Sequence, residues 1–315
     1  MLPLVGLIRN GFSHRNKGQR PEIPQDRNIL VASPTTKPEL ERALADFARK
    51  NIGILAISGG DGTIRDVMTC GAPVFGGNWP KIIILPRGKT NALAIDLGLP
   101  GKWSLAAALD AAAQGGVTRR HPLLFQRTDA DQRDQYGFIM GTGVFNVALE
   151  AGQVAHRYGA FQSFAIGVTV CFGILQALFG FGKSRWRRLT NIRIHAEPQG
   201  EAIPHSGHGR PDGRFLAGFT TLTRFPLGLG PFTGAPEDAV IHYLAIDAPL
   251  RRAVALVPSA LFGNDTQYMR EIGIQRGSAK GFTASLEEQF ILDGEAFPGG
   301  DYRVRLGPEL QFVVP

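Results

Sequence analysis

The first third of the chain repeats one unit: a continuous apolar run, a polar or glycine-rich turn, and a helical pattern. Ile52–Ile57 is such a run and stops at Gly59, and Trp79–Leu85 is another that stops at Pro86. Uninterrupted apolar runs are typical of strands buried on both faces of a parallel sheet. Their alternation with helices predicts right-handed crossovers and an α/β domain whose helices cover that sheet.

Local signals place the other elements of this first domain. Thr36–Asn51 is predicted to be a helix, because Thr36 can cap its N-terminus and apolar residues fall on one stripe. We also expect strands at Leu2–Arg9 and Asn28–Ala32, and helices at Thr63–Met68, Thr90–Leu97 and Trp103–Gln114. The α/β domain is predicted to cover residues 1–122.

Short β-rich runs separated by turn residues replace this alternation after residue 122, which is typical of a sandwich or barrel. A β-rich second domain is therefore expected over residues 123–300, with helical insertions at Phe145–Phe181 and Leu250–Phe262. Gln199–Arg214 is rich in Pro, Gly and His and is predicted to be an exposed loop. Its His205 and His208 have a spacing that can bind a metal, but no further ligand is nearby, which favours solvated histidines.

Charge and cysteine content limit the compartment and the partners. The chain has 34 Lys and Arg against 27 Asp and Glu, a net charge of +7, which favours nucleotide phosphates, nucleic acid or an acidic membrane. Nucleic acid ranks last, because the basic residues are scattered and aromatic residues do not alternate with them. Two cysteines in apolar stretches exclude a disulfide scaffold and suit the cytoplasm. The N-terminus lacks the pattern of a signal peptide.

A long uncharged stretch raises the question of membrane contact. Tyr158–Gly182 has 25 residues without Asp, Glu, Lys or Arg, enough to span a bilayer. Its five glycines and two glutamines favour a buried or interface-lying helix instead. The basic residues that follow, Lys183, Arg185, Arg187 and Arg188, predict either peripheral contact with anionic lipid or a solvated loop.

The clearest chemical signal is the string Gly59–Thr63, Gly-Gly-Asp-Gly-Thr, between a buried strand and a helix. Parallel α/β sheets bind ligands at the carboxyl ends of their strands. Paired glycines let backbone N–H groups approach phosphate oxygens, and the next helix adds a positive dipole end. Asp61 could help to hold Mg²⁺ or accept a proton from an attacking hydroxyl. By itself, this string could also be an ordinary turn with a capping aspartate.

Two further loops make a phosphate site the favoured interpretation. Pro86–Asn91 also joins a strand to a helix, and there Gly88 permits close approach while its neighbours offer donors. Asn10–Gly18 follows the first strand and is polar and basic. Three loops at successive strand ends are expected to converge on one crevice. A Walker P-loop, a dinucleotide fingerprint and a protein-kinase signature are all missing from the sequence.

Taken together, these segments resemble the diacylglycerol kinase catalytic-domain family, the soluble bacterial lipid kinases related to eukaryotic sphingosine and ceramide kinases. The resemblance runs along nearly the whole chain. NAD kinases and, more loosely, phosphofructokinases share the Gly59–Thr63 string. The Pro86–Asn91 turn, with Leu97-Gly98 one helix later, and the late Asp293-Gly294-Glu295 point to the lipid kinases.

The resemblance implies a fold, a reaction and a set of site residues. The fold is an α/β nucleotide domain like that of NAD kinases and diacylglycerol kinases, followed by a β-rich lipid-substrate domain, with residues 301–315 returning toward the first domain. The reaction is ATP-dependent phosphorylation of a hydroxyl on a diacylglycerol-like or sphingoid-like lipid. Asp61 and Glu295 are the implied catalytic residues. The implied nucleotide-binding residues are Asn10, Lys17, Gly59, Gly60, Gly62, Thr63, Gly88, Thr90 and Asn91.

Several positions depart from the family pattern. The turn that usually reads Gly-Thr-x-Asn-Asp is Gly-Lys-Thr-Asn-Ala over residues 88–92, and Arg65-Asp66 stand where Asn-Glu is common. The Asp-Gly expected after Asp238 is also missing, so we expect no metal site made by protein residues and expect Mg²⁺ to enter with ATP. These departures leave two alternatives open: a kinase of a soluble hydroxyl compound such as NAD, and a non-catalytic nucleotide-binding module. The sequence leaves the oligomeric state unknown.

Overall fold

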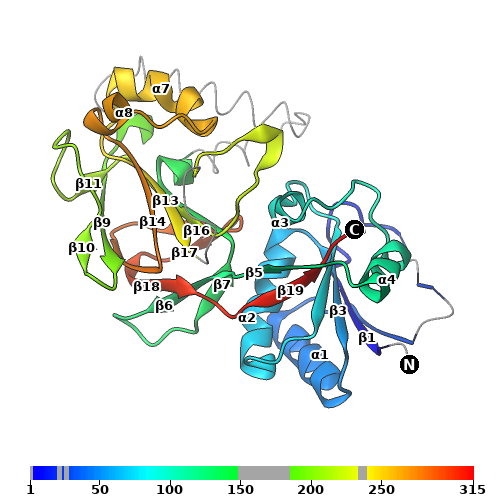
Figure 1. Cartoon of the computed structure of the whole chain (residues 1–315). Helices are drawn as coiled ribbons and strands as arrows, with labels where there is room; N and C mark the ends of the chain where they lie inside the picture. The colour runs from blue at the N-terminus through cyan, green and yellow to red at the C-terminus, as the bar shows by residue number, and fades with distance from the viewer. Residues whose placement is uncertain (1–2, 20–22, 25–27, 148–184, 233–239) are drawn as a thin grey trace.

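The computed structural model describes residues 3–19, 23–24, 28–147, 185–232 and 240–315. Figure 1 shows two lobes, with the first part of the chain and the C-terminus together in one of them. The expected helical insertion at Phe145–Phe181 and the uncharged stretch within it fall almost entirely outside the described residues. Among the described residues, no helix is both long and apolar enough to cross a membrane.

The first lobe is built on a six-stranded sheet with helices around it (Figure 1). The sheet order is β2 (Ile29–Ala32), β1 (Val5–Arg9), β3 (Ile54–Gly59), β4 (Lys81–Pro86), β19 (Leu310–Val313) and β5 (Val117–Arg120). All neighbours pair in parallel except β19 and β5. The helices are α1 (Lys37–Arg49), α2 (Asp61–Phe75), α3 (Ala92–Asp96) and α4 (Leu105–Gln114). The predicted parallel α/β domain is confirmed.

Local signals set the ends of two of these helices. The Thr36 side chain accepts a hydrogen bond from the N–H of Glu39 at 3.4 Å, which confirms the predicted cap of α1. The helix predicted from Thr90 begins two residues later, so that part of the prediction is wrong. Asn91 there has a left-handed backbone with φ of 53°, which a regular helix cannot accommodate.

The second lobe is a sandwich of two sheets whose described strand pairs are antiparallel. One has the order β10 (Glu201–Ala202), β9 (Thr190–Glu197), β15 (Gly281–Leu286), β18 (Gly300–Leu306), β6 (Leu123–Arg127) and β7 (Gln135–Gly137), and β11 (Gly213–Arg214) pairs with β9. The other has the order β14 (Ile274–Ala279), β13 (Ile241–Ile246), β12 (Leu216–Thr220), β8 (Ile139–Gly143), β16 (Phe290–Leu292) and β17 (Glu295–Phe297). The expected β-rich second domain is confirmed.

Aromatic side chains fill the space between these two sheets. Phe125, Phe219, Phe282 and Phe290 are fully buried there, and the rings of Phe219 and Phe282 stack with centroids 4.9 Å apart. Outside the sandwich, α7 (Arg251–Leu261) and α8 (Gln267–Glu271) pack on the β13–β14 side. Short 3₁₀ turns lie at η1 (Arg185–Arg187) and η2 (Pro226–Gly228). The segment Gln199–Arg214 is not entirely loop, because its two ends pair with β9 as β10 and β11.

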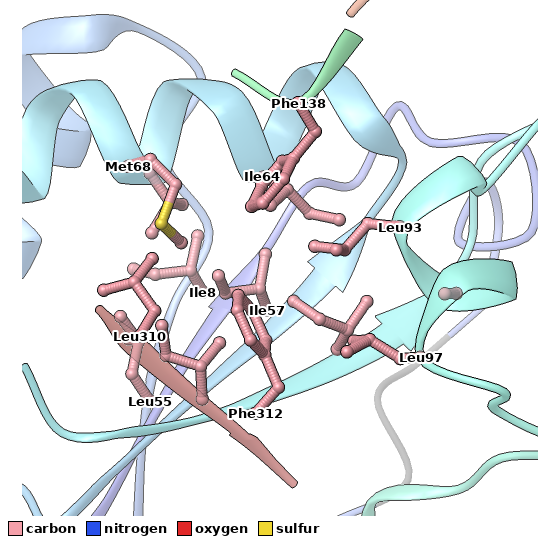
Figure 2. Close-up of a cluster of buried hydrophobic side chains, with 14 of the residues drawn as sticks. Ile8, Leu55, Ile57, Ile64, Met68, Leu93, Leu97, Phe138, Leu310 and Phe312 are labelled. Atoms are coloured by element: carbon pink, nitrogen blue, oxygen red, sulfur yellow. The ribbon is translucent and has the colours of Figure 1, made fainter. Parts of the chain in front are cut away.

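The terminal segment divides between the two lobes. β18 belongs to the sandwich, and β19 inserts between β4 and β5 of the first sheet. In return, Phe138, which lies between β7 and β8, joins the core of the first lobe and lies beside Ile64 of α2 in Figure 2. Its ring meets that of Phe312 edge-on at 6.3 Å. The two lobes therefore share one stretch of core, which fixes the α2 region against the β7–β8 connection.

Candidate functional site

Three loops meet at the carboxyl edge of the first sheet, because β1, β3 and β4 are adjacent and parallel. They are Asn10–Gly18 (the first loop), Gly59–Thr63 (the glycine loop) and Arg87–Asn91 (the third loop). The N–H of Asn10 donates to the carbonyl of Ser58 at 3.0 Å, and the N–H of Arg87 donates to that of Gly59 at 2.8 Å. The predicted convergence of the three loops is thus present in the structure.

The glycine loop and the third loop touch through their backbones. A Cβ added to Gly60 would lie 2.8 Å from the Cα of Gly88, and one added to Gly88 would lie 2.6 Å from the Cα of Gly60. A Cβ on Gly59 would lie 2.5 Å from the side chain of Thr63. Lack of space thus excludes any side chain at these positions, which leaves the backbone as the surface that a ligand meets.

The first loop is tied to the glycine loop by two asparagines. Asn10 donates from Nδ2 to the hydroxyl of Thr63 at 2.9 Å and accepts from the N–H of Phe12 at 3.0 Å. Asn16 is buried and donates from Nδ2 to the carbonyls of Asn10 and Ser58. Asn10 thereby fixes the position of Thr63 at the start of α2.

Asn91 shapes the third loop from within. Its Oδ1 accepts from the N–H of Gly88 at 2.8 Å, and its Nδ2 donates to the carbonyl of the same residue at 3.0 Å. The amide that sequence reasoning offered to a ligand therefore serves its own turn. Lys89 and Thr90, at the tip of this turn, are exposed.

A hollow of about 490 Å³ lies over the glycine loop between the other two. Six of the nine predicted nucleotide-binding residues line it: Asn10, Lys17, Gly60, Gly62, Thr63 and Gly88. The others, Gly59, Thr90 and Asn91, do not. Residues that the resemblance did not imply also line it, namely Phe12, Ser13, His14, Arg65, Asp66 and Lys89. The hollow thus combines backbone amides, a hydroxyl and several cations, which suits an anionic ligand.

Asp61 is the first residue of α2 and faces the start of α3. Its Oδ1 accepts from the N–H of Leu93 at 3.4 Å. A carboxylate at a helix N-terminus is stabilised by the free N–H groups there. Burial nevertheless raises the pKa of Asp61, and the backbone N–H groups of α3 oppose this rise. Asp61 lies within the glycine loop but does not line the hollow itself.

Asp293, in the second domain, lies near enough to Asp61 for the charge of Asp61 to act on its carboxyl group. Asp293 occupies the turn between β16 and β17 with φ of 45°, and its carboxylate accepts from the N–H groups of Phe138 and Ile139 at 3.0 Å each. Burial, and then the charge of Asp61, raise the pKa of Asp293 to about 7. Sequence reasoning interpreted Asp293 as a turn former, and the only signal for more was the Asp-Gly-Glu string.

Glu295 starts β17, and its side chain is 46% exposed. Its carboxylate pairs with the guanidinium of Arg65, and Lys37 lies 4.0 Å away. Arg65 comes from α2, is only 3% exposed and also donates to the carbonyl of Leu292 at 3.2 Å. The two predicted catalytic residues thus have different partners, because Asp61 faces α3 whereas Glu295 pairs with Arg65.

The predicted loop histidines have separate partners. His205 Nε2 lies 3.9 Å from Asp247 Oδ1, and His208 Nε2 lies 3.4 Å from the Arg252 guanidinium. In the described part of the chain, no group of three or more His, Cys, Asp or Glu side chains is placed to hold a metal ion. The segment around Asp238 lies outside it.

Residues 12–122 match the diacylglycerol kinase catalytic domain. This match covers most of the first domain and agrees with the resemblance found in the sequence. It is 28% identical to a protein named probable lipid kinase YegS-like from Klebsiella pneumoniae (strain 342), over 97% of this chain and 94% of that protein. It is 27% identical to a probable lipid kinase YegS from Salmonella arizonae, over 96% and 92% of the two.

The fold of the whole chain has a match among solved structures. A crystal structure of a diacylglycerol kinase from Bacillus anthracis covers 99% of this chain, and 97% of that chain is covered in turn. The TM-score is 0.64 at 14% sequence identity, so this likeness concerns the fold. The fold of this chain is therefore of the expected class in both domains.

Proposed function

We propose that this protein transfers the γ-phosphate of ATP to a hydroxyl group of a lipid of the diacylglycerol or sphingoid type. The observation that carries the proposal is the backbone contact between Gly60 and Gly88, which builds a side-chain-free floor under a hollow bordered by cations. Phosphoryl transfer depends on positioning and charge neutralisation more than on covalent chemistry. This arrangement supplies both, and the names of the curated relatives support a lipid as the acceptor.

The hollow has the donor set that a triphosphate needs. The backbone of Gly60 and Gly62 lies at the N-terminus of α2, where free N–H groups and the helix dipole favour anions. Thr63 adds a hydroxyl held by Asn10. Lys17 and Lys89 are exposed at the rim, where their charges can reach phosphate oxygens.

Mg²⁺ is proposed to enter bound to ATP. The carboxylate oxygens of Asp61, within the glycine loop, are the kind of ligand that a hard cation prefers. When bound, the ion would neutralise phosphate charge beside the glycine loop. We assign no further metal site to the described residues.

The two implied catalytic carboxylates have different proposed roles. Asp61, buried at the start of α2 and α3, is proposed to orient the reacting groups beside the glycine loop. Glu295, whose side chain is half-exposed and comes from the second domain, is proposed to accept the hydroxyl proton of the lipid. The lipid itself would reach the site from a membrane, so we also propose peripheral contact with anionic lipid in the cytoplasm.

Labelled ATP tests this function directly. The purified protein is incubated with [γ-³²P]ATP, Mg²⁺ and mixed micelles that contain either diacylglycerol or a sphingoid base, and label is followed into the organic phase. We expect transfer with wild type, a loss of at least 100-fold in Asp61→Asn, and normal transfer in Asp131→Asn, which changes an exposed carboxylate. Equal transfer by wild type and Asp61→Asn would contradict the proposal.

The same assay separates the alternatives. A water-soluble phosphorylated product formed without lipid would support a kinase of a soluble alcohol such as NAD. Binding of ATP without turnover on any acceptor would support a non-catalytic nucleotide-binding module.

A further inference from the structure

Arg65 links the helix that follows the glycine loop to the second domain. It lies one turn into α2, its side chain is 4% exposed, and it lines the hollow over the glycine loop. A Cβ placed on Gly62 would lie 3.9 Å from its Nη2 and 4.0 Å from its Nη1. The guanidinium is therefore within reach of a ligand seated on the backbone of Gly62.

The contacts of the guanidinium divide by atom. Nη1 donates to the carbonyl of Leu292 at 3.2 Å, and the plane lies over the ring of Phe297 at 5.7 Å, which hold the group against the β16–β17 hairpin. Nη2 donates to Asp66 at 2.9 Å and also pairs with Glu295. Nη2 carries two hydrogens, and both are engaged. An anion at Gly62 can bond to Nη2 only by displacing one of these carboxylates.

Glu295 is the carboxylate that can leave. Its side chain is 46% exposed, against 30% for Asp66, so its release into water carries the smaller penalty. Asp66 is also the next residue on α2 and moves with Arg65. Lys37, whose Nζ lies 4.0 Å from both carboxylates, offers Glu295 a second cation.

We propose that Arg65 exchanges Glu295 for the terminal phosphate of bound ATP, so that nucleotide binding releases the Glu295 carboxylate for the acceptor hydroxyl. This inference rests on the proposed kinase function. In the step itself, the hydroxyl proton passes to Glu295 and the alcohol oxygen bonds to the γ-phosphorus. The bond from that phosphorus to the β,γ-bridging oxygen breaks, and ADP leaves with the electron pair of that bond. Arg65 offsets charge on the transferred group.

If Glu295 and the phosphate compete for Arg65, loss of the Glu295 charge should change the affinity for a triphosphate. Removal of the negative charge in Glu295→Gln should tighten binding of a triphosphate, because Arg65 is then no longer held by a carboxylate. Arg65→Asn should weaken triphosphate binding about 10- to 100-fold, as expected for the loss of a charge-assisted contact. In the double variant, the effect of Glu295→Gln should vanish.

The experiment measures binding by calorimetry with Mg²⁺ and either the β,γ-imido analogue of ATP or ADP. We expect Glu295→Gln to tighten the ATP analogue at least threefold while ADP changes less than twofold. Glu201→Gln, an exposed carboxylate on β10, serves as the control for removal of one negative charge. Arg65→Lys, which keeps the charge without the fork, should show an intermediate loss and covers the case in which Arg65→Asn does not fold.

The outcomes separate this inference from the function on which it rests. If wild type binds neither nucleotide, the nucleotide assignment itself fails and the inference fails with it. If wild type binds the ATP analogue but Glu295→Gln binds it no better, or if the gain persists in the Arg65→Asn background, the exchange is wrong while the kinase proposal stands. A gain that appears for ADP as strongly as for the ATP analogue also overturns it.

Discussion

The carboxylate of Asp96, at the end of α3 in the first domain, accepts a hydrogen bond of 2.7 Å from the N–H of Thr223 in the second domain. The same oxygen accepts from the hydroxyl of Thr223 and from the N–H of Arg224. The other oxygen pairs with Arg120 at 2.6 Å. Asp96 is 1% exposed, so one buried carboxylate joins α3, β5 and the segment after β12.

Loss of this carboxylate should destabilise the whole chain. We expect Asp96→Ala to lower the free energy of unfolding by about 3 kcal/mol, because it leaves Arg120 and two backbone N–H groups without their shared acceptor. Asp96→Asn keeps one acceptor oxygen and should lose about half as much. Urea unfolding measures both, with the exposed Asp131→Ala as the control. Equal stability of Asp96→Ala and the control would show that the link between the domains contributes nothing.

The contact between Gly60 and Gly88 gives a second prediction. Gly88→Ala places a methyl group 2.6 Å from the Cα of Gly60, so the two loops must separate. We expect a loss of about 1–3 kcal/mol in stability and at least a tenfold loss in affinity for ATP. Gly77→Ala is the matched control, because a Cβ there meets nothing within 4 Å. Unchanged ATP affinity in Gly88→Ala would place the nucleotide elsewhere.

Phe12 gives a third prediction. Its side chain is 78% exposed and lines the hollow, although burial of such a ring would ordinarily be favourable. An exposed aromatic face beside a phosphate site offers a surface on which a base can stack. Phe12→Ala should therefore weaken ATP binding about fivefold, whereas Phe12→Tyr should preserve it. Inorganic triphosphate, which has no base, should bind wild type and Phe12→Ala equally. Stability should not change, and a loss of stability equal to the loss of affinity would contradict a role in binding.

The sequence predicted those parts of the fold that depend on local signals. The runs around Ile54–Gly59 and Lys81–Pro86 are strands because their apolar residues are buried on both faces, and α1 begins where Thr36 can cap it. β14 and β15 follow each other over residues 274–286 without pairing. β14 pairs with β13 in one sheet, and β15 pairs with β9 and β18 in the other. Such pairing depends on partners far away in the sequence.

The same limit applies to the candidate site. The glycine loop and its two neighbouring loops could be predicted, because they follow directly from the ends of parallel strands. The pairing of Arg65 with Glu295 and the approach of Asp293 to Asp61 could not, since both depend on how the second domain packs against α2. No spacing within the sequence records that packing. The nearest signal was the departure at Arg65, a charged residue where the family pattern has asparagine.

The carboxyl groups of Asp61 and Asp293 predict how stability depends on pH. Burial raises the pKa of both, and the charge of Asp61 helps to raise that of Asp293 to about 7. The folded protein thus holds protons that the unfolded chain releases near about pH 4. A group whose pKa is raised on folding binds more protons in the native state, so this pair lowers stability as the pH rises from about 4 to about 7.

Asp61→Asn removes one of these two charges and should make the protein more stable at pH 8, by about 1–2 kcal/mol, while it abolishes activity. The gain should shrink as the pH falls and disappear below about pH 4, where both carboxyl groups of wild type are protonated. Urea unfolding of the two proteins between pH 4 and pH 8 measures the difference. A gain that is the same at every pH, or a loss at pH 8, would mean that the two carboxyl groups do not repel each other in the folded protein.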